Sequence, residues 1–146
     1  MSSGGALAED ELLDALVQVA FHVTGVLSRI GAENDLSLTQ LRVFGILRDR
    51  RPRVTELATH LGLDKSTISG LIDRAEKRGF LARARSADDR RAVEVFLTPA
   101  GRELTTRIYT EVRRELDPMM NVLSADQRAR LHELLLLIGL DHHADD

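Results

Sequence analysis

Residues 88–91 read DDRR, two acids followed by two bases, in a chain whose net charge is −3. They stand between two segments of alternating apolar residues, 81–85 and 93–98, so we expect them at the tip of a β-hairpin. Guanidinium groups bind phosphate through several N–H donors, which makes anion binding the chemistry open to this tip. Its two adjacent carboxylates are not the opposed pair that flanks a substrate in a glycosidase.

The sequence carries no recognisable catalytic motif. No Gly-rich phosphate loop follows a predicted strand, and neither H-E-x-x-H nor G-x-S-x-G occurs. The absence of cysteine excludes disulfides, thiolate metal sites and a thiol-oxidation sensor. His142 and His143 lie near acidic residues, but adjacent histidines without a second ligand cluster are poor metal spacing. We therefore expect no cofactor, no metal site and no enzyme activity.

The charge of the chain is unevenly distributed. From Arg48 to Arg91 there are twelve Lys or Arg and seven Asp or Glu, a net charge of +5, whereas the remainder carries −8. A basic middle attracts a polyanion even when the whole chain is acidic, although charge alone also fits an ordinary solvated surface. Aromatic residues make up only 3% and there is no Trp, which disfavours a stacking platform for single-stranded nucleic acid.

Two short helical segments occupy the middle of the chain. Thr55 is the expected N-cap of a first helix that runs through Leu61, and Gly62 supplies the turn after it. Asp64 is the expected N-cap of a second helix that runs to Gly79. Two short helices joined by a tight turn that contains Gly match the helix-turn-helix motif.

The second of these helices has one apolar face and one polar face. At about 100° per residue, the apolar arc holds Ile68, Leu71, Ile72 and Ala75. The opposite arc holds Lys65, Ser66, Ser69, Gly70 and Asp73, with Arg74 and Lys77 at its margins. Small donors and acceptors near a helix N-terminus can reach base edges, and the helix dipole favours phosphate there. An ordinary surface helix carries more Glu and Lys, so recognition is the better interpretation.

Two further helices are expected before this motif. Residues 9–30 are apolar on more than one helical face, which predicts a helix buried on two sides, with Gly31 as its stop. In the next helix Ser37 and Gln40 have the spacing of a capping box, and Pro52 prevents any continuation. Its expected buried residues are Leu41, Val43, Phe44 and Leu47.

Two helices are also expected after the hairpin. Thr98, followed by a proline, is the N-cap of a long helix that ends near Pro118, and Ser124 and Gln127 form a second capping box. The last helix contains the run LLLLI at 134–138, so it is apolar on every side. An exposed helix of this kind would leave a large apolar patch, so we expect the first and last helices to pack together across a homodimer. No heptad repeat is sustained, which disfavours a coiled coil.

The two ends of the chain predict no membrane insertion. Residues 1–8 lack a basic region and a long apolar run, so we expect a flexible tail and not a signal peptide. The longest uninterrupted apolar run, residues 134–140, is far too short to span a bilayer. We expect a soluble cytoplasmic protein with no membrane partner.

The sequence resembles winged helix-turn-helix regulators of the MarR type. The residues that carry the resemblance are LATHLGLDKSTISGLIDRAEKRGFLAR (57–83) and DDRRAVEVFLTPAG (88–101). The resemblance implies a mainly α fold with a small β-hairpin wing, in an intertwined homodimer whose N- and C-terminal helices form the dimer interface. The implied domains are a flexible tail at 1–8, an N-terminal dimerisation helix at 9–36, a winged helix-turn-helix DNA-binding domain at 37–99, C-terminal dimerisation helices at 100–141, and a flexible tail at 142–146.

The resemblance also implies how DNA is bound. The recognition helix, 64–79, enters the major groove and the wing, 81–98, enters the adjacent minor groove. Asp89 orients the basic side chains of the wing, and an arginine held in this way suits a narrow minor groove. Many members of the family carry a long basic residue at the position of Gly70, so in this chain either base contacts shift to Ser66, Thr67, Ser69 and Arg74 or recognition depends more on DNA shape. The expected DNA-binding residues are Arg53, Lys65, Ser66, Thr67, Ser69, Arg74, Arg90 and Arg91.

Members of this family are often repressors that a small aromatic or anionic effector releases from DNA. His22, Arg29 and Phe44 are the candidates to line such an effector site, although His22 also fits a dimer-interface histidine and Arg29 a helix-end cation. We expect a pseudo-palindromic operator with half-sites one helical turn, about 34 Å, apart. A winged helix used only for protein contact, and a small enzyme whose site has no recognised motif, remain the alternatives.

Overall fold

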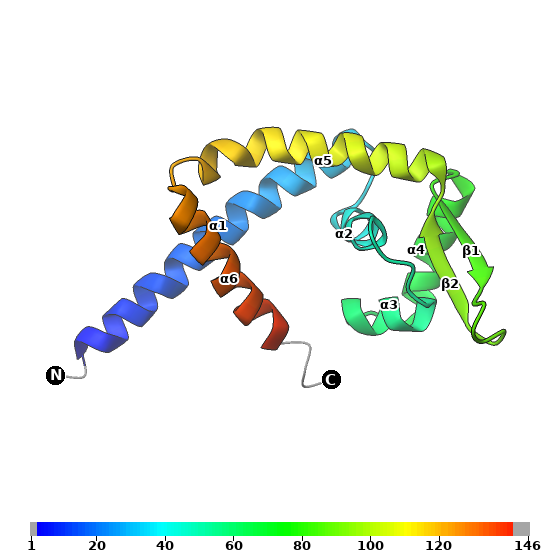
Figure 1. Ribbon diagram of the computed structural model, residues 1–146, viewed down its shortest axis with the longest axis horizontal. Helices are drawn as coiled ribbons and strands as arrows, with labels where there is room; N and C mark the ends of the chain where they lie inside the picture. The colour runs from blue at the N-terminus through cyan, green and yellow to red at the C-terminus, as the bar shows by residue number, and fades with distance from the viewer. Residues whose placement is uncertain (1–2, 142–146) are drawn as a thin grey trace. The chain divides into compact units, whose positions relative to one another are not determined.

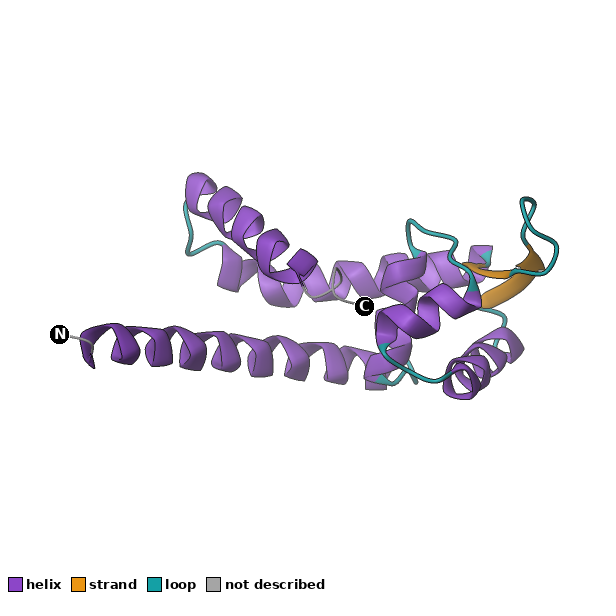
Figure 2. Ribbon diagram, turned by 90° about the horizontal axis from the view of Figure 1, so that it is seen from below, coloured by secondary structure: helices purple, strands orange, loops and turns teal. Residues whose placement is uncertain are grey.

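The computed structural model describes residues 3–141, which form a mainly helical chain with one β-hairpin (Figures 1 and 2). Its elements are α1 (Ser3–Glu33), α2 (Leu38–Leu47), α3 (Val54–Leu61), α4 (Lys65–Lys77), β1 (Leu81–Arg85), β2 (Val93–Leu97), α5 (Pro99–Met120) and α6 (Ala125–Asp141). This order confirms the expected mainly helical fold with a β-hairpin wing, and the homodimer stays a prediction. The chain divides into two compact units, Met1–Leu41 and Arg42–Asp146, and the division falls inside α2.

Helix α1 is longer at both ends than the sequence pattern predicts. It begins at Ser3, so the flexible tail expected over residues 1–8 is wrong for residues 3–8, whereas residues 1, 2 and 142–146 lie outside the described part. Starting a helix is costly, but each residue added to an existing helix gains one hydrogen bond for the conformational freedom that it loses. A long helix therefore extends easily through small residues at its end. The helix also continues past Gly31 to Glu33.

Gly31 has a different role from the expected helix stop. The helix ends in a Schellman motif, in which Asp35 takes the left-handed conformation (φ 57°) that Gly was expected to take. The Leu36 N–H donates to the Gly31 carbonyl at 2.8 Å and the Asp35 N–H to the Ala32 carbonyl at 3.1 Å. A β-carbon on Gly31 would lie 2.8 Å from the Leu36 carbonyl oxygen, so the glycine lets the chain fold back closely.

The start of α2 and the start of α6 confirm both capping boxes. The Gln40 N–H donates to Ser37 Oγ at 3.1 Å, and the Ser37 N–H donates to Gln40 Oε1 at 2.8 Å. Ser124 and Gln127 make the same reciprocal pair at 3.2 and 2.9 Å. The predicted buried residues of α2, Leu41, Val43, Phe44 and Leu47, are all at most 9% exposed.

Helices α3 and α4 form the predicted helix-turn-helix, with one error at its start. Helix α3 begins at Val54 and its N-cap is Arg53, so the predicted Thr55 cap is wrong. Arg53 forms a β-bridge with Glu94, which fixes an extended backbone immediately before the helix. Gly62 takes the left-handed turn at φ 65°, as predicted. The apolar face of α4, Ile68, Leu71, Ile72 and Ala75, is buried as predicted.

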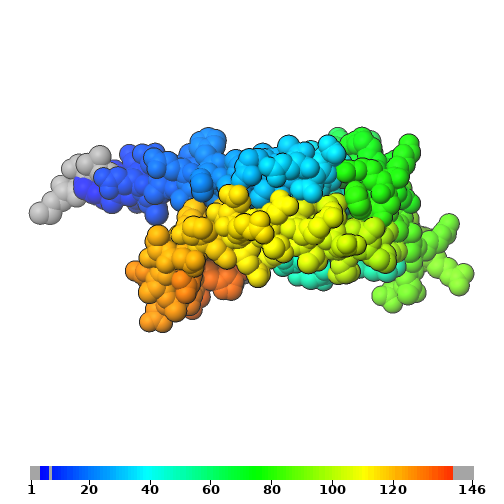
Figure 3. Space-filling model, turned by 90° about the horizontal axis from the view of Figure 1, so that it is seen from above, coloured from blue at the N-terminus to red at the C-terminus, as the bar shows by residue number. Residues whose placement is uncertain are grey.

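The wing is an antiparallel hairpin of two five-residue strands, and the segment before α3 runs beside it. Leu81 pairs with Leu97 at its base and Arg85 with Val93 toward its tip. The Val95 N–H donates to the Pro52 carbonyl at 3.0 Å, so the segment before α3 runs along β2. In Figure 3 the tip projects from the surface around it.

The first turn of α5 lies against the residues that follow α4. Thr98 caps α5 as predicted, because its Oγ accepts the Gly101 N–H at 3.0 Å, and its hydroxyl also donates to the Gly79 carbonyl at 2.6 Å. A β-carbon on Gly101 would overlap the Phe80 carbonyl. The predicted end of α5 near Pro118 is slightly wrong, since the helix continues to Met120 with this proline in its last turn.

Helices α1 and α6 expose most of their apolar side chains. Those at least 40% exposed include Leu12, Leu13, Leu16, Val17, Val19, Phe21, Leu134, Leu135, Leu136, Leu137 and Ile138. The predicted burial of the first helix on two sides is therefore not met within one chain. Among the described residues, Gly4–Glu33 is long and apolar enough to cross a membrane by length and composition alone. A core helix of a soluble protein meets the same test.

The close approach at Gly101 gives a stability prediction. Gly101→Ala should lower the free energy of unfolding by about 1–3 kcal/mol, because the added methyl group forces α5 away from Phe80. The matched control is Gly45→Ala in α2, where nothing lies within 4 Å of the added carbon and better helix propensity should give up to about 1 kcal/mol of stabilisation. Urea unfolding at one protein concentration measures both, and equal stability of the two variants would contradict the prediction.

Candidate nucleic-acid interface

Asp64 holds the N-terminal turn of α4 in place. Its Oδ1 accepts the Thr67 N–H at 2.7 Å and the Ser66 hydroxyl at 2.7 Å. These hydrogen bonds, the Thr67 backbone N–H first, lower the pKa of the Asp64 carboxyl below its ordinary value of 3.8. The Ser66 hydroxyl hydrogen is therefore already used, so this side chain offers acceptor positions to a ligand.

The polar face of α4 is accessible along its length. Lys65, Ser66, Thr67 and Arg74 are exposed, and Ser69 is half-buried. At Gly70 an added β-carbon would lie 3.4 Å from Nη1 of Arg74, so the Arg74 guanidinium lies beside the space that a longer side chain at this position would enter. A cation thus occupies the middle of this face although the residue there is glycine.

Arg83, which the sequence analysis did not single out, ties the wing to α4. Its Nη2 donates to Asp73 Oδ1 at 2.6 Å and to the Ser69 carbonyl at 3.2 Å, and its Nη1 donates to Glu76 Oε2 at 2.9 Å. The sequence does contain a signal for this contact, namely Arg83 in the alternating segment LARAR and two acidic residues, Asp73 and Glu76, one helical turn apart on α4. Their pairing becomes evident only once the hairpin is known to lie against α4.

Asp89 shapes the wing tip through the backbone. Its Oδ1 accepts the Arg91 N–H at 3.0 Å, and its carbonyl accepts the Ala92 N–H at 3.0 Å. The Ser86 N–H donates to the Ala92 carbonyl at 2.9 Å, which closes the turn. Asp89 thus contacts the main chain that carries Arg91 and not an arginine side chain, and the side chains of Arg90 and Arg91 are exposed.

A hollow of about 230 Å³ lies between the wing, α3 and α4. Its lining residues are Val54, Thr55, Lys65, Ser69, Arg83, Arg91, Ala92 and Val93. Three predicted contacts, Lys65, Ser69 and Arg91, thus meet around one space although they are up to 26 positions apart in the sequence. Ser66, Thr67, Arg74 and Arg90 do not line it.

Arg53 lies at the start of α3, where its Nε is 3.6 Å from Glu56 Oε1 and its side chain is 41% exposed. This ion pair is on the surface and contributes little to stability. Arg53 does not line the hollow between wing and helices.

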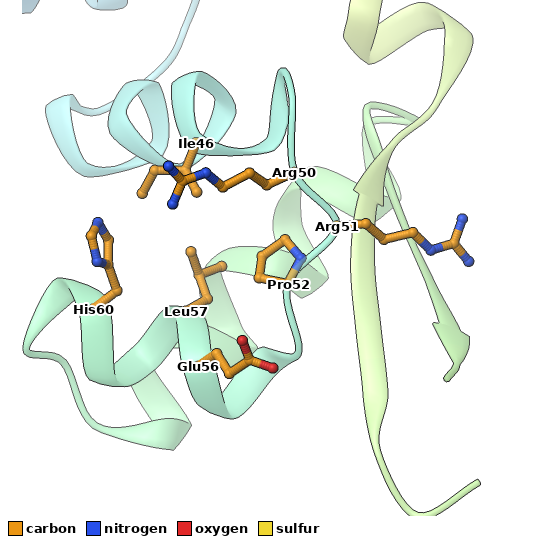
Figure 4. A pocket seen from close by; sticks show the side chains of 7 residues that line it. All are labelled: Ile46, Arg50, Arg51, Pro52, Glu56, Leu57 and His60. Carbon is orange, nitrogen blue, oxygen red and sulfur yellow. The ribbon is translucent and has the colours of Figure 1, made fainter. Parts of the chain in front are cut away.

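A second hollow, of about 380 Å³, lies between α2 and α3 (Figure 4). Ile46, Pro52 and Leu57 give it an apolar floor, and Arg50 and His60 stand at its rim. Arg51 also belongs to its edge but points away, toward the hairpin. There its guanidinium lies 4.0 Å from the centre of the Phe96 ring, and its Nε lies 3.2 Å from Glu94.

The three effector candidates differ in exposure. His22 and Arg29 are exposed on α1, and Arg29 pairs with Glu33 at 3.3 Å. Phe44 is 1% exposed and meets Phe80 edge to face, with ring centroids 6.3 Å apart. Burial does not support a ligand-lining role for Phe44 within one chain.

Among the described residues no group of three or more His, Asp or Glu side chains could hold a metal ion. The His142–His143 pair lies outside that part of the chain. The expectation of no metal site is therefore untested at the C-terminus.

Comparisons with a family model and with curated proteins both match this chain to transcriptional regulators. A family model described as the MarR family matches residues 34–92. An uncharacterised HTH-type transcriptional regulator of Bacillus subtilis (strain 168), YfiV, is 30% identical over 106 residues, which are 72% of this chain and 66% of that protein. The HTH-type transcriptional repressor YetL of the same strain is 30% identical over 95 residues, 63% of this chain and 57% of that protein. The chain thus spans about two thirds or less of the length of these two relatives.

A solved structure shares the fold. CouR from Rhodococcus jostii RHA1, bound to p-coumaroyl-CoA, superposes with a TM-score of 0.77 at 23% identity, over 89% of this chain and 92% of that one. At 23% identity this similarity establishes the fold alone. The bound p-coumaroyl-CoA is a ligand of CouR.

The lowered pKa of Asp64 predicts how acid affects α4. A carboxylate whose pKa is lower in the folded than in the unfolded state stabilises the fold fully at a pH above the unfolded-state pKa. This stabilisation is lost as the pH falls through the folded-state pKa. Wild type should therefore be more stable than Asp64→Asn, which still caps but carries no charge, at neutral pH, and the difference should vanish well below pH 3.8. Thermal unfolding across pH measures this, and a difference independent of pH would contradict the assigned role.

Proposed function

The chain belongs to the MarR family of transcriptional regulators, and we propose that it represses transcription by binding operator DNA as a homodimer. The observation that carries the proposal is the hollow at which α4 and the wing tip meet. Lys65 from the first turn of α4 and Arg91 from the wing line it together. A recognition helix and a wing joined in this way suit adjacent major and minor grooves.

Each group on this surface has a chemical task in the proposal. Lys65 lies at the positive end of the α4 dipole and binds a backbone phosphate. Thr67 and Ser69 have small side chains that can approach base edges, and Arg74 lies beside Gly70 and reads a base or a phosphate. Arg91 enters the minor groove, where a narrow groove concentrates negative potential.

The distribution of charge supports this assignment. The segment from Arg48 to Arg91 carries +5 and contains the recognition helix, the first strand of the wing and the arginines of its tip, whereas the rest of the chain carries −8. DNA is attracted to the basic segment and repelled by the acidic remainder, which orients the protein as it approaches DNA. A winged helix that contacts only proteins would not require this separation.

A second copy of the chain is the proposed cover for α1 and α6. Phe21 and Leu12 are 74% and 71% exposed on α1, and Val122, before α6, is 82% exposed. An apolar surface of this extent marks an interaction site. A two-fold dimer presents two recognition helices, which implies a pseudo-palindromic operator. Burial in a dimer also accounts for the membrane-like composition of α1, so we place the protein in the cytoplasm, where DNA is accessible.

Release by a small molecule is the proposed means of control. CouR binds an aromatic acyl-CoA, and we propose an aromatic or anionic effector for this chain as well. His22 and Arg29, exposed on α1, are the candidate contacts, and the burial of Phe44 counts against its inclusion. No catalytic role is proposed, because the relatives are regulators.

The direct test is fluorescence anisotropy with DNA from upstream of the protein's own coding sequence. We expect tighter binding to this duplex than to a scrambled one, one dimer per site, and a steep loss of affinity with added salt because counterions are released. Equal, salt-insensitive affinities would favour the protein-contact alternative. Addition of candidate effectors to the complex then tests release.

Arg91→Ala tests the wing contact. We expect it to weaken operator binding by about 1–3 kcal/mol and to reduce the salt slope by at most about one. Arg107→Ala, an exposed arginine on α5 outside the interface, is the matched control and should change neither quantity. Unchanged affinity and slope for Arg91→Ala would remove this residue from the proposed contacts.

A further inference from the structure

One arginine connects the two parts of the proposed interface. Arg83 lies in the middle of β1, opposite Val95, and its side chain is 28% exposed. Its guanidinium reaches three acceptors on α4, namely the carboxylates of Asp73 and Glu76 and the carbonyl of Ser69. The planar fork of an arginine engaged at three acceptors fixes both the position and the tilt of the group.

These contacts matter because the hairpin is weakly held by itself. A two-stranded hairpin is marginally stable in water without packing against another element. Its tip carries Arg91, eight residues beyond Arg83, so a small rotation at the middle of β1 moves the tip by a larger amount. The hydrogen bonds of the tip, from Ser86 to Ala92, are made within the turn itself or with Arg85, whose Nη1 donates to the Arg90 carbonyl at 3.4 Å.

We infer that Arg83 is a positioning residue, which sets the orientation of the wing relative to the recognition helix. It does so by holding β1 to the Asp73–Glu76 turn of α4, and the fixed orientation lets Arg91 and Ser69 engage adjacent grooves together. The DNA part of this inference rests on the proposed function. The mechanical part, that Arg83 fixes the wing on α4, does not.

A purely electrostatic role is the competing explanation. Asp73 and Glu76 would repel phosphate if left unpaired, and any cation at position 83 would neutralise them. Arg83→Lys separates the two roles, because lysine keeps the charge but lacks the fork that engages several acceptors at once. Under the positioning role, Arg83→Lys behaves like Arg83→Gln; under the electrostatic role, it behaves like wild type.

The matched control is Arg51→Gln. Arg51 also pairs with a carboxylate of the wing, Glu94, at 3.2 Å, and it stacks on Phe96. It attaches to β2 from the segment before α3, and both of these contacts are with β2. Loss of this pair removes a surface ion pair at the wing without releasing β1 from α4.

The first measurement needs no DNA. Because the chain has no cysteine, spin labels at Lys77→Cys and Ala87→Cys report the distance between the end of α4 and the wing tip. An excess of unlabelled chain keeps the two labels of a dimer within one protomer. We expect a narrow distance distribution for wild type and Arg51→Gln, and a clearly broader one for Arg83→Lys. Equal widths for wild type and Arg83→Lys would overturn the inference.

The second measurement is a double-mutant cycle on the operator. Arg83→Lys should weaken binding by about tenfold, or about 1.4 kcal/mol. Arg91→Ala should then cost much less in the Arg83→Lys background than in wild type, because a released wing no longer delivers Arg91. Independent, multiplicative effects would overturn the inference, as would coupling of the same size with Arg51→Gln.

Failure of the proposed function and failure of the Arg83 inference give different results. If wild type does not bind its upstream DNA, the proposed function fails, and the distance measurement still decides whether Arg83 fixes the wing. If Arg83 variants do not fold, as circular dichroism would show, Asp73→Asn with Glu76→Gln weakens the same contact from α4. That variant should broaden the distance distribution in the same way, and an unchanged width would overturn the inference.

Discussion

The contact between the first turn of α5 and the residues that follow α4 is the constraint on which the helix-turn-helix and the wing depend. Thr98 bonds the carbonyl of Gly79 and the N–H of Gly101, and Gly101 leaves no room for a side chain beneath the Phe80 carbonyl. The recognition helix ends, β1 begins, β2 ends and α5 starts within this one cluster. The base of the wing is therefore fixed to both helices, and only its outer part requires another contact.

The acidic residues of the basic segment are largely occupied by the fold. Asp64 caps α4, Asp73 and Glu76 hold Arg83, and Asp89 holds the turn at the wing tip. These four carboxylates accept hydrogen bonds from backbone N–H groups or from Arg83, so they are not left unpaired beside the exposed cations. The cations that remain exposed, on α4 and at the tip, give the lobe its positive surface.

The two ends of the chain pose a different physical problem. Helices α1 and α6 carry apolar side chains on more faces than one chain covers, and their leucines stay exposed. The free energy of burying that surface is large compared with the marginal stability of a small domain. Dimerisation is thus part of the proposed fold itself and, through two-fold symmetry, of the proposed operator.

Features that depend on neighbours in the sequence were predictable from the sequence. Both capping boxes, the Asp64 and Thr98 caps, the Gly62 turn and the hairpin all depend on residues within a few positions of one another, as does the buried face of α4. Residue type and family resemblance also predicted DNA contacts for Lys65, Ser69 and Arg91, which line one hollow, and their role in binding stays a prediction.

The tertiary structure decided what depends on distant partners. Thr55 fits an N-cap by type, yet pairing of Arg53 with Glu94 in the wing sets the helix start two residues earlier. Gly31 and Gly101 are glycines because returning backbone passes close to them, and the Arg83 acceptors are on another element. Local sequence determines hydrogen bonds a turn apart, whereas these contacts exist only after elements far apart in the chain have packed together.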